Sequence, residues 1–303
     1  MACLRRGFHF KCPADIPDLM KHLVSYTKEA LSFTYDEQLE EDLGKEPILA
    51  AFDEALANLK AFDSYSCELM NKNKDLSYAN WKLLTSWSMA TETFLKCLKL
   101  FLSTRLRNEQ ESECEGQFAE LMVNFTRIFF MTPESGDARK RELDINKVRV
   151  SSTPDIHFIK DTSSSEGLGT LLVLCAEVHK AVIDASTLVN VSFKANEMIE
   201  SKILGQHGGS LLLEKTSSAF EPKVLGMICH RTKIMFTYMD LKSSHYKIIV
   251  QKGVVKDDKH RCIIYYTRPY DFLIKSDRDE ILEFLFWIGF IQSIDIGENI
   301  ENK

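Results

Sequence analysis

The fold of this 303-residue chain is decided by residues 154–180, which read PDIHFIKDTSSSEGLGTLLVLCAEVHK. Two short apolar runs, 156–159 and 171–176, flank a polar Ser/Gly-rich segment, which predicts two adjacent strands joined by a flexible hairpin. Asp155 precedes the first run and Glu177 follows the second. A buried carboxylate needs a partner, because an isolated buried charge is strongly unfavourable. Two carboxylates on neighbouring strands can share a divalent cation such as Mg²⁺, which prefers oxygen ligands.

Each carboxylate also has a purely structural explanation. Asp155 follows Pro154 and can simply initiate the strand as a turn residue. Glu177 can cap a following helix by accepting hydrogen bonds from the backbone N–H groups of its first turn. Because the two residues together are less easily explained this way than either alone, the metal-site hypothesis stands beside these alternatives.

The composition indicates a globular protein with one large core or two modest ones, since 45% of its residues are hydrophobic and 27% are charged. The net charge of -6 does not favour a general polyanion binder. Eight cysteines without a Cys-x-x-Cys pair are typical of reduced thiols in a cytoplasmic or nuclear protein. We expect neither a signal peptide nor a membrane span, because no apolar run approaches roughly 18 residues.

Residues 1–108 are predicted to be an all-helical N-terminal region. Apolar side chains recur at helical spacing over 15–33, over 47–62 and over 78–107. The aromatic side chains of the last segment are explained by helix–helix packing rather than by a ligand groove. A fourth helix is predicted over 109–130, where the second domain, residues 109–303, begins.

From residue 132 onward the pattern changes. Residues 132–144 contain proline, glycine and mixed charges, which predicts a solvated connector. Alternating apolar residues beyond it predict strands, interrupted by a helix over 181–213 with a bend at Gly205–Gly209. The predicted strands cover 148–150, 155–159, 171–177, 223–229, 233–241, 246–251 and 261–267, and a helix over 277–294 follows them.

From residue 109 onward, the predicted elements follow the order helix, three strands, helix and further strands. Residues 154–180 lie within this order of elements. Pro154-Asp155, then twenty-one residues, then Glu177-Val178-His179-Lys180 resembles the bipartite motif of the PD-(D/E)XK nuclease superfamily. The resemblance covers about residues 109–294 and extends, through the helix with Gln206 and the two strands after it, to Crinkler-type relatives. It implies an α/β, restriction-endonuclease-like fold, in which helices flank a mixed β-sheet.

The resemblance also implies a chemistry. Asp155 and Glu177 would bind Mg²⁺ and the protein would be a phosphodiesterase acting on DNA or RNA. The family's lysine, two positions after the glutamate, is replaced here by His179. Lys180 is one residue late, so strand alternation predicts that it points to the opposite face. A neutral histidine can act as a general base, yet it changes the charge of the site, so we expect metal binding with little or no turnover.

Two further residues join the candidate catalytic set only by analogy with the family. Glu120 lies on the helix before the strands, and Gln206 lies on the helix after them. The alternatives are that Glu120 faces solvent on an amphipathic helix and that Gln206 ends its helix before Gly208. His179 likewise has the alternative of an ordinary exposed or hydrogen-bonded histidine.

The charge distribution suggests where a nucleic acid would bind. Residues 223–275 contain eleven Lys and Arg against four Asp and Glu. A solvated sheet face, with lysines that prevent edge pairing, is the alternative explanation. The candidate phosphate contacts are Arg231, Lys233, Lys247 and Arg261.

Two functions therefore remain open at the level of sequence. The first is a nuclease-like, Mg²⁺-dependent phosphodiesterase with a degraded motif. The second is a non-catalytic interaction or scaffold protein, which binds a partner protein through its helical half. The chain contains no Walker A loop, zinc-ligand spacing or Gly-x-Ser-x-Gly elbow, so ATPase and serine-hydrolase functions have no support.

Overall fold

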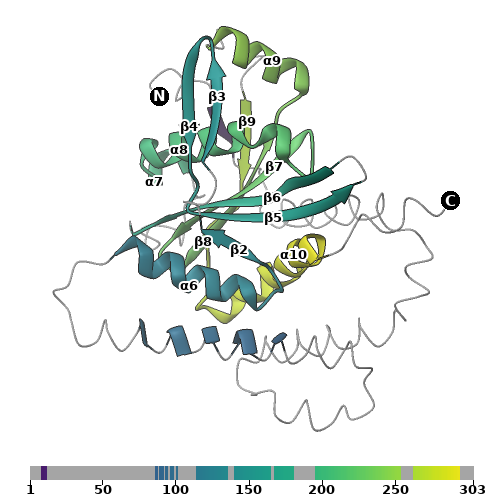
Figure 1. Ribbon diagram of the computed structural model, residues 1–303. Coiled ribbons are helices and arrows are strands. Elements are labelled where there is room, and N and C mark those ends of the chain that lie inside the picture. Colours follow the sequence, from purple (N-terminus) through teal and green to yellow (C-terminus); the bar gives the residue numbers. More distant parts are fainter. Residues whose placement is uncertain are drawn as a thin grey trace.

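The computed structural model describes a mixed α/β protein, in which helices flank a mixed multi-stranded sheet (Figure 1). The described positions within 86–101 are helical. Of residues 1–108, all others except 8–11 lie outside the described residues, and so do the helices predicted over 15–33 and 47–62. The described residues are 8–11, 86–87, 89–91, 93–94, 96–98, 100–101, 114–135, 140–164, 167–180, 195–253 and 262–293.

The sheet has the strand order β1-β9-β8-β7-β6-β5-β2, and β10 pairs with β8. The pairs β6/β7 and β1/β9 are parallel, whereas the other pairs are antiparallel. The strands are β1 (Phe8–Lys11), β2 (Pro133–Ser135), β5 (Ile156–Ser164), β6 (Gly167–His179), β7 (Lys223–His230), β8 (Lys233–Asp240), β9 (Cys262–Tyr266) and β10 (Tyr270–Asp271).

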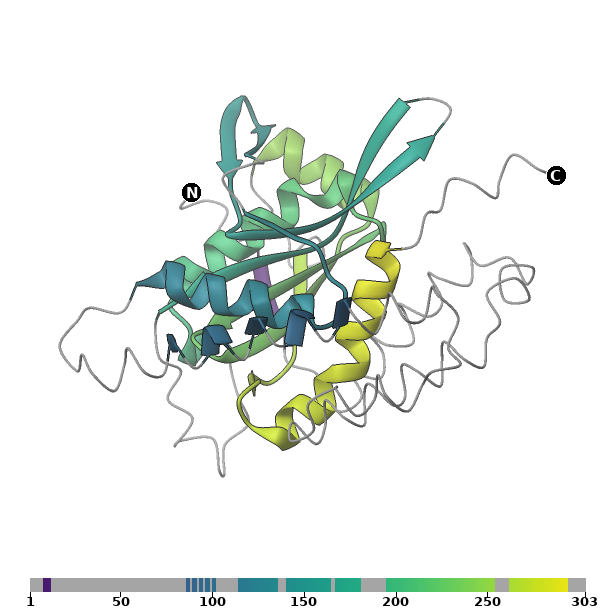
Figure 2. The same ribbon diagram turned by 60° about the horizontal axis from the view of Figure 1, so that its bottom comes forward.

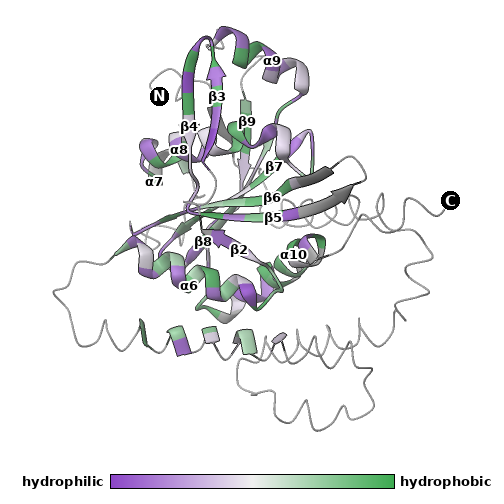
Figure 3. Cartoon of the chain, in the orientation of Figure 1, coloured by the Kyte–Doolittle hydropathy of each residue, from purple (hydrophilic) through white to green (hydrophobic). Residues whose placement is uncertain are grey.

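Helices cover both faces of this sheet (Figures 1 and 2). One face packs against α6 (Glu115–Arg127), α10 (Lys275–Ser293) and the helical positions of 86–101. The other face packs against α8 (Ser201–Leu213), which the short α7 (Ala195–Met198) precedes and a 3₁₀ turn at Lys215–Ser217 follows. Figure 3 shows apolar residues concentrated on the interior strands and on α10. The middle of the sheet is therefore buried on both sides, which explains the near-continuous apolar run before Glu177.

A two-stranded hairpin, β3 (Arg141–Ile145) and β4 (Val148–Ser152), lies apart from the main sheet. Its turn residues Asn146 and Lys147 both have positive φ, as a tight two-residue hairpin turn requires. Its tip rests on α9 (Ser243–Lys252), where the Asn146 N–H donates to the carbonyl of Val250 at 2.8 Å. The hairpin thus bridges α9 and the residues directly before Asp155.

Several local predictions were wrong. The segment 246–251, predicted as a strand, lies in α9, because only Ile249 is fully buried and Gly253 ends the helix in the left-handed conformation. The predicted connector at 132–144 contains β2 and most of β3. The sequence pattern also gave no sign of β1 within the region predicted to be all-helical.

The helix predicted over 181–213 has its break in a different place. Its described part divides at residues 199–200, between α7 and α8, and α8 then continues through Gly205 and Gly208–Gly209. Burial against the sheet compensates for the weak helix propensity of these glycines. The segment 181–194 lies outside the described residues.

Two further observations bear on the class of protein. Within the described part of the chain, no helix combines the length and the apolar character needed to cross a membrane. The described cysteines are all free thiols, at positions 97, 114, 175, 229 and 262.

Candidate functional site

The two motif carboxylates meet at one end of the sheet. In the antiparallel β5/β6 pair Ile156 lies opposite Ala176, with Asp155 directly before this pair and Glu177 directly after it. The Asp155 carboxylate also accepts a hydrogen bond from the Val178 N–H at 2.7 Å, which fixes it beside the Glu177 backbone. Asp155 is exposed, whereas Glu177 is fully buried.

Two side chains of α8 hold the Glu177 carboxylate by hydrogen bonds. Gln206 Nε2 donates to its Oε2 at 2.7 Å, and Ser210 Oγ donates to its Oε1 at 2.7 Å. The two donors are four residues apart, so they lie on the same face of α8. Gly226 on β7 permits this close approach, because a Cβ there would lie 2.7 Å from the His207 ring.

Burial decides the ionisation of Glu177. It raises the pKa of this carboxyl from 4.5 to about 7, and the negative charge of Asp155 raises it further, against the opposing hydrogen bonds from Ser210 and Gln206. The side chain is therefore partly protonated near neutral pH. A cation beside the two carboxylates would favour the ionised form, because it would remove their mutual repulsion.

His179 lies two residues after Glu177 and shares its face of β6. Its Nδ1 is 3.9 Å from Glu115 Oε1, and its Nε2 is buried without a hydrogen-bond partner among the described residues. Burial lowers the pKa of His179, and the charges of Asp155, Glu115 and Glu200 raise it in opposition. His179 is therefore neutral near pH 7, so position 179 carries no positive charge.

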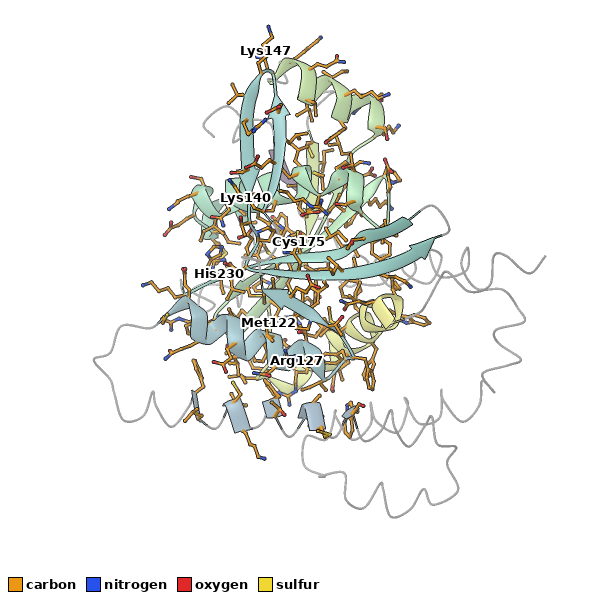
Figure 4. The ribbon with its side chains drawn as sticks, viewed as in Figure 1. Met122, Arg127, Lys140, Lys147, Cys175 and His230 are labelled. Carbon is orange, nitrogen blue, oxygen red and sulfur yellow. The ribbon has the colours of Figure 1, made fainter. Side chains whose placement is uncertain are left out.

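Lys180 is exposed and takes part through its backbone, as its carbonyl accepts a hydrogen bond from Arg231 Nε at 3.0 Å. Arg231 adopts φ 57°, its N–H donates to the His179 carbonyl, and its guanidinium lies 6.0 Å from the Phe118 ring. His230, labelled in Figure 4, lies at the same end of the sheet, with its ring 5.6 Å from that of His179. Arg231 is thus fixed beside the end of β6.

The remaining described candidates come from α6, the β7–β8 turn and α9. Glu120 is exposed on α6, and its charge adds to burial in raising the pKa of Cys97, so it lies beside the helix over 86–101. The α6 carboxylate near the site is Glu115, which sequence reasoning missed. Arg231 and Lys233 flank the β7–β8 turn, whereas Lys247 is exposed on α9. Arg261 lies outside the described residues.

A second buried polar cluster continues along α8. Glu214 accepts hydrogen bonds from Arg141 Nε at 3.2 Å and Ser217 Oγ at 2.6 Å, and His157 Nε2 lies 3.4 Å from its Oε1. Burial opposes ionisation of Glu214, but these neighbours lower its pKa overall. Ser152 Oγ lies 2.6 Å from Ser210 Oγ, so the base of the hairpin contacts a residue that binds Glu177.

No family model matches the chain, and it has no significant match among curated proteins or solved structures.

The metal-ligand chemistry of the site rests on the carboxylate pair. The described residues contain no group of three or more His, Cys, Asp or Glu side chains arranged to hold a metal ion. Asp155 and Glu177 offer oxygen ligands only, the type that Mg²⁺ and Mn²⁺ accept together with water and phosphate. Neither the motif nor the charge pattern indicated Ser210. The one sequence feature that could have indicated it is its spacing of four residues from Gln206.

Proposed function

We propose that residues 109–294 form a restriction-endonuclease-like domain related to the PD-(D/E)XK nucleases, in which Asp155 and Glu177 bind a divalent cation and phosphodiester cleavage is slow or absent. The order of elements supports this proposal. A helix (α6) precedes three antiparallel strands (β2, β5, β6), and α8 then leads to β7, which is parallel to β6. This is the order on which the resemblance to the family rests.

The observation that carries the proposal is the pairing of Asp155 with Glu177. They are twenty-two positions apart in the sequence, yet the Asp155 carboxylate accepts a hydrogen bond from the N–H of Val178, the residue after Glu177. Gln206, a candidate only by family analogy, donates directly to Glu177. Burying a carboxylate next to a second one is unfavourable without a cation, so a purely structural role explains this arrangement poorly.

The residues present fit Mg²⁺ or Mn²⁺. Asp155 and Glu177 would hold the cation, and their oxygens are the ligands that these ions prefer. A bound divalent cation would activate water and stabilise the negative charge that develops on a phosphate. Of the chain's own residues, Gln206 and Ser210 orient Glu177, and the Val178 N–H orients Asp155.

Slow or absent turnover is proposed because the site lacks positive charge at position 179. A neutral His179 replaces a cationic lysine, and Lys180 is exposed at the end of β6. Arg231 and Lys233, on the β7–β8 turn, are the basic residues best placed to contact the phosphates of DNA or RNA, whereas Lys247 on α9 would contact a more distant part of the strand.

Titration calorimetry with Mn²⁺ tests the metal half of the proposal at about pH 8, where Glu177 is mostly ionised. We expect millimolar binding by the wild type and its loss in Asp155→Asn and Glu177→Gln. Glu142→Gln, an exposed carboxylate on the hairpin, is the matched control and should bind like the wild type. Equal heats for all four proteins would exclude a metal site at the carboxylate pair.

His179→Lys tests the activity half, because it restores the family's lysine. We expect Mn²⁺-dependent cleavage of single-stranded DNA or RNA to rise above the wild-type level, and Glu177→Gln in the same background to abolish it. Robust cleavage by the wild type, lost in Glu177→Gln, would contradict slow turnover and support a full nuclease.

One observation favours the alternative of a non-catalytic interaction protein. Met89 and Leu100 in the helical half are 64% and 69% exposed. They are eleven residues apart, about three turns, so they lie on the same side of a helix. Exposed apolar side chains on one helix face suit a protein partner. This alternative would gain support if none of the proteins in the calorimetry experiment bound Mn²⁺.

A further inference from the structure

A stripe of polar residues runs along α8 at four-residue spacing, from Lys202 through Gln206 and Ser210 to Glu214. Residues four apart lie on one helix face, one above the other. Three members of the stripe contact polar side chains of the sheet: Gln206 and Ser210 bind Glu177, and Glu214 lies beside His157. The fourth, Lys202, occupies the first turn.

Exposure increases along this stripe toward its N-terminal end. Glu214 and Ser210 are each 1% exposed, Gln206 is half-buried and Lys202 is exposed. The solvent-exposed end of the stripe is therefore the first turn of α8, whose backbone N–H groups add positive potential.

Lys202 lies one turn before Gln206, on the face of α8 that contacts Glu177. No carboxylate of the described residues lies within ion-pair distance of Lys202. His179 is only 9% exposed and its Nε2 has no partner among those residues, so this nitrogen is available to a polar ligand.

We propose that Lys202 supplies the cationic group that binds a substrate phosphate at the Asp155–Glu177 site, with His179 beside it as a second hydrogen-bonding group. The ligand class is a phosphodiester of a single-stranded nucleic acid. A lysine ammonium binds phosphate as a compact point charge and reaches it on a flexible stem, so it can act from a helix as well as from a strand. This inference rests on the proposed function.

The test measures binding of a short fluorescent single-stranded DNA by anisotropy, with Mn²⁺ present, over a series of salt concentrations. We expect Lys202→Met to weaken binding about tenfold and to reduce the slope of log K against log salt by about 0.7, the value for one phosphate contact on a single strand. Lys202→Arg should retain most of the affinity. Lys252→Met, an exposed lysine on α9, is the matched control and should bind like the wild type.

The effect of Lys202 should depend on the carboxylate site. In a Glu177→Gln background, which lacks the cation, Lys202→Met should change DNA binding much less than in the wild type. Mn²⁺ binding itself should be unchanged in Lys202→Met, since Lys202 is not a ligand.

The outcomes separate the two proposals. Wild-type DNA affinity and salt slope in Lys202→Met, with Mn²⁺ binding intact, would overturn the role of Lys202 and leave the metal site standing. Failure of the wild type to bind the DNA would overturn it as well. Failure of the wild type to bind Mn²⁺ would overturn the proposed function, and this inference with it.

Discussion

The two faces of the central sheet are built from different chemistries. On the face covered by α6 and α10, Phe125 stacks with Phe272 at 4.6 Å between ring centroids and contacts Phe94 and Phe129. On the face covered by α8, the strands bury Glu177 and His157, and α8 buries His207, beside ordinary apolar residues. The aromatic face stabilises the protein without directional bonds. On the α8 face, part of the buried area belongs to hydrogen-bonded polar groups. A surplus of stability on one face permits an unfavourable site on the other.

The largest expected loss of stability comes from a substitution on the aromatic face. Phe125 is fully buried and surrounded by three aromatic rings, so Phe125→Ala removes their contacts and leaves a cavity. We expect a loss of about 3–5 kcal/mol in the free energy of unfolding, measured by urea denaturation. Phe125→Leu should cost clearly less. A loss below that of any α8-face variant would contradict the division of roles between the two faces.

The second prediction is that a substitution on the α8 face increases the free energy of unfolding. Glu177 is neutral in the folded and unfolded chains at acidic pH, and its pKa is about 7 folded against 4.5 ordinarily. As pH rises through this window the unfolded chain loses its proton first, so stability falls. Glu177→Gln removes this loss and should stabilise the metal-free protein by roughly 3 kcal/mol above pH 7.

Urea denaturation in a chelating buffer at acidic and alkaline pH measures this effect. The gain should shrink as pH falls and vanish below pH 4.5, where the carboxyl of the wild type is mostly protonated in both states. A gain that did not change with pH would show that packing, rather than ionisation, distinguishes the two side chains.

The third prediction concerns the distance between α8 and the sheet. In Gly226→Ala the new Cβ would lie 2.7 Å from Thr237 Oγ1 and 2.8 Å from Leu211 Cδ2, so α8 must move outward. We expect a loss of about 1–3 kcal/mol in stability and weaker Mn²⁺ binding. Gly209→Ala, on the same helix with no atom within 4 Å, is the matched control. It should be neutral or stabilising, because alanine favours the helix.

The smallest expected effect comes from removing a single hydrogen bond on the α8 face. Ser210→Ala removes the donor to Glu177 Oε1, which should cost about 1 kcal/mol and raise the pKa of Glu177 further. Because Mn²⁺ binds the ionised carboxylate, the pH midpoint of Mn²⁺ binding should move upward. Ser152→Ala, one hydrogen bond farther away, should shift it less. Identical midpoints in all three proteins would contradict the role of Ser210.

Much of the strand order around the site could be predicted from the sequence, because β5, β6, β7 and β8 carry clear apolar runs bounded by turn residues. The α9 error has a physical cause, since a short apolar run such as Ile248–Val250 fits a strand and a half-buried helix equally well. β1 was missed because four residues at a sheet edge carry little periodic signal.

The site itself was only partly predictable. Asp155 and Glu177 are linked by one hairpin, so a local pattern indicated their pairing. Glu115, Ser210 and Lys202 reach the site from helices whose orientation depends on tertiary packing, which the spacing of residues along a strand does not encode. Glu120 was chosen by analogy, and it lies on α6 beside Cys97.

The parallel pairing of β6 with β7 has a consequence for the order of folding. Asp155 and Glu177 come together when a local hairpin closes, whereas Gln206 and Ser210 arrive only after the crossover over residues 180–222 has closed. Non-local contacts form late, because loop closure is entropically unfavourable. We therefore expect α8 to dock onto a carboxylate that takes up a proton as it is covered. Stopped-flow refolding should slow as pH rises from about 4.5 to 7 in the wild type, and Glu177→Gln should lose this dependence.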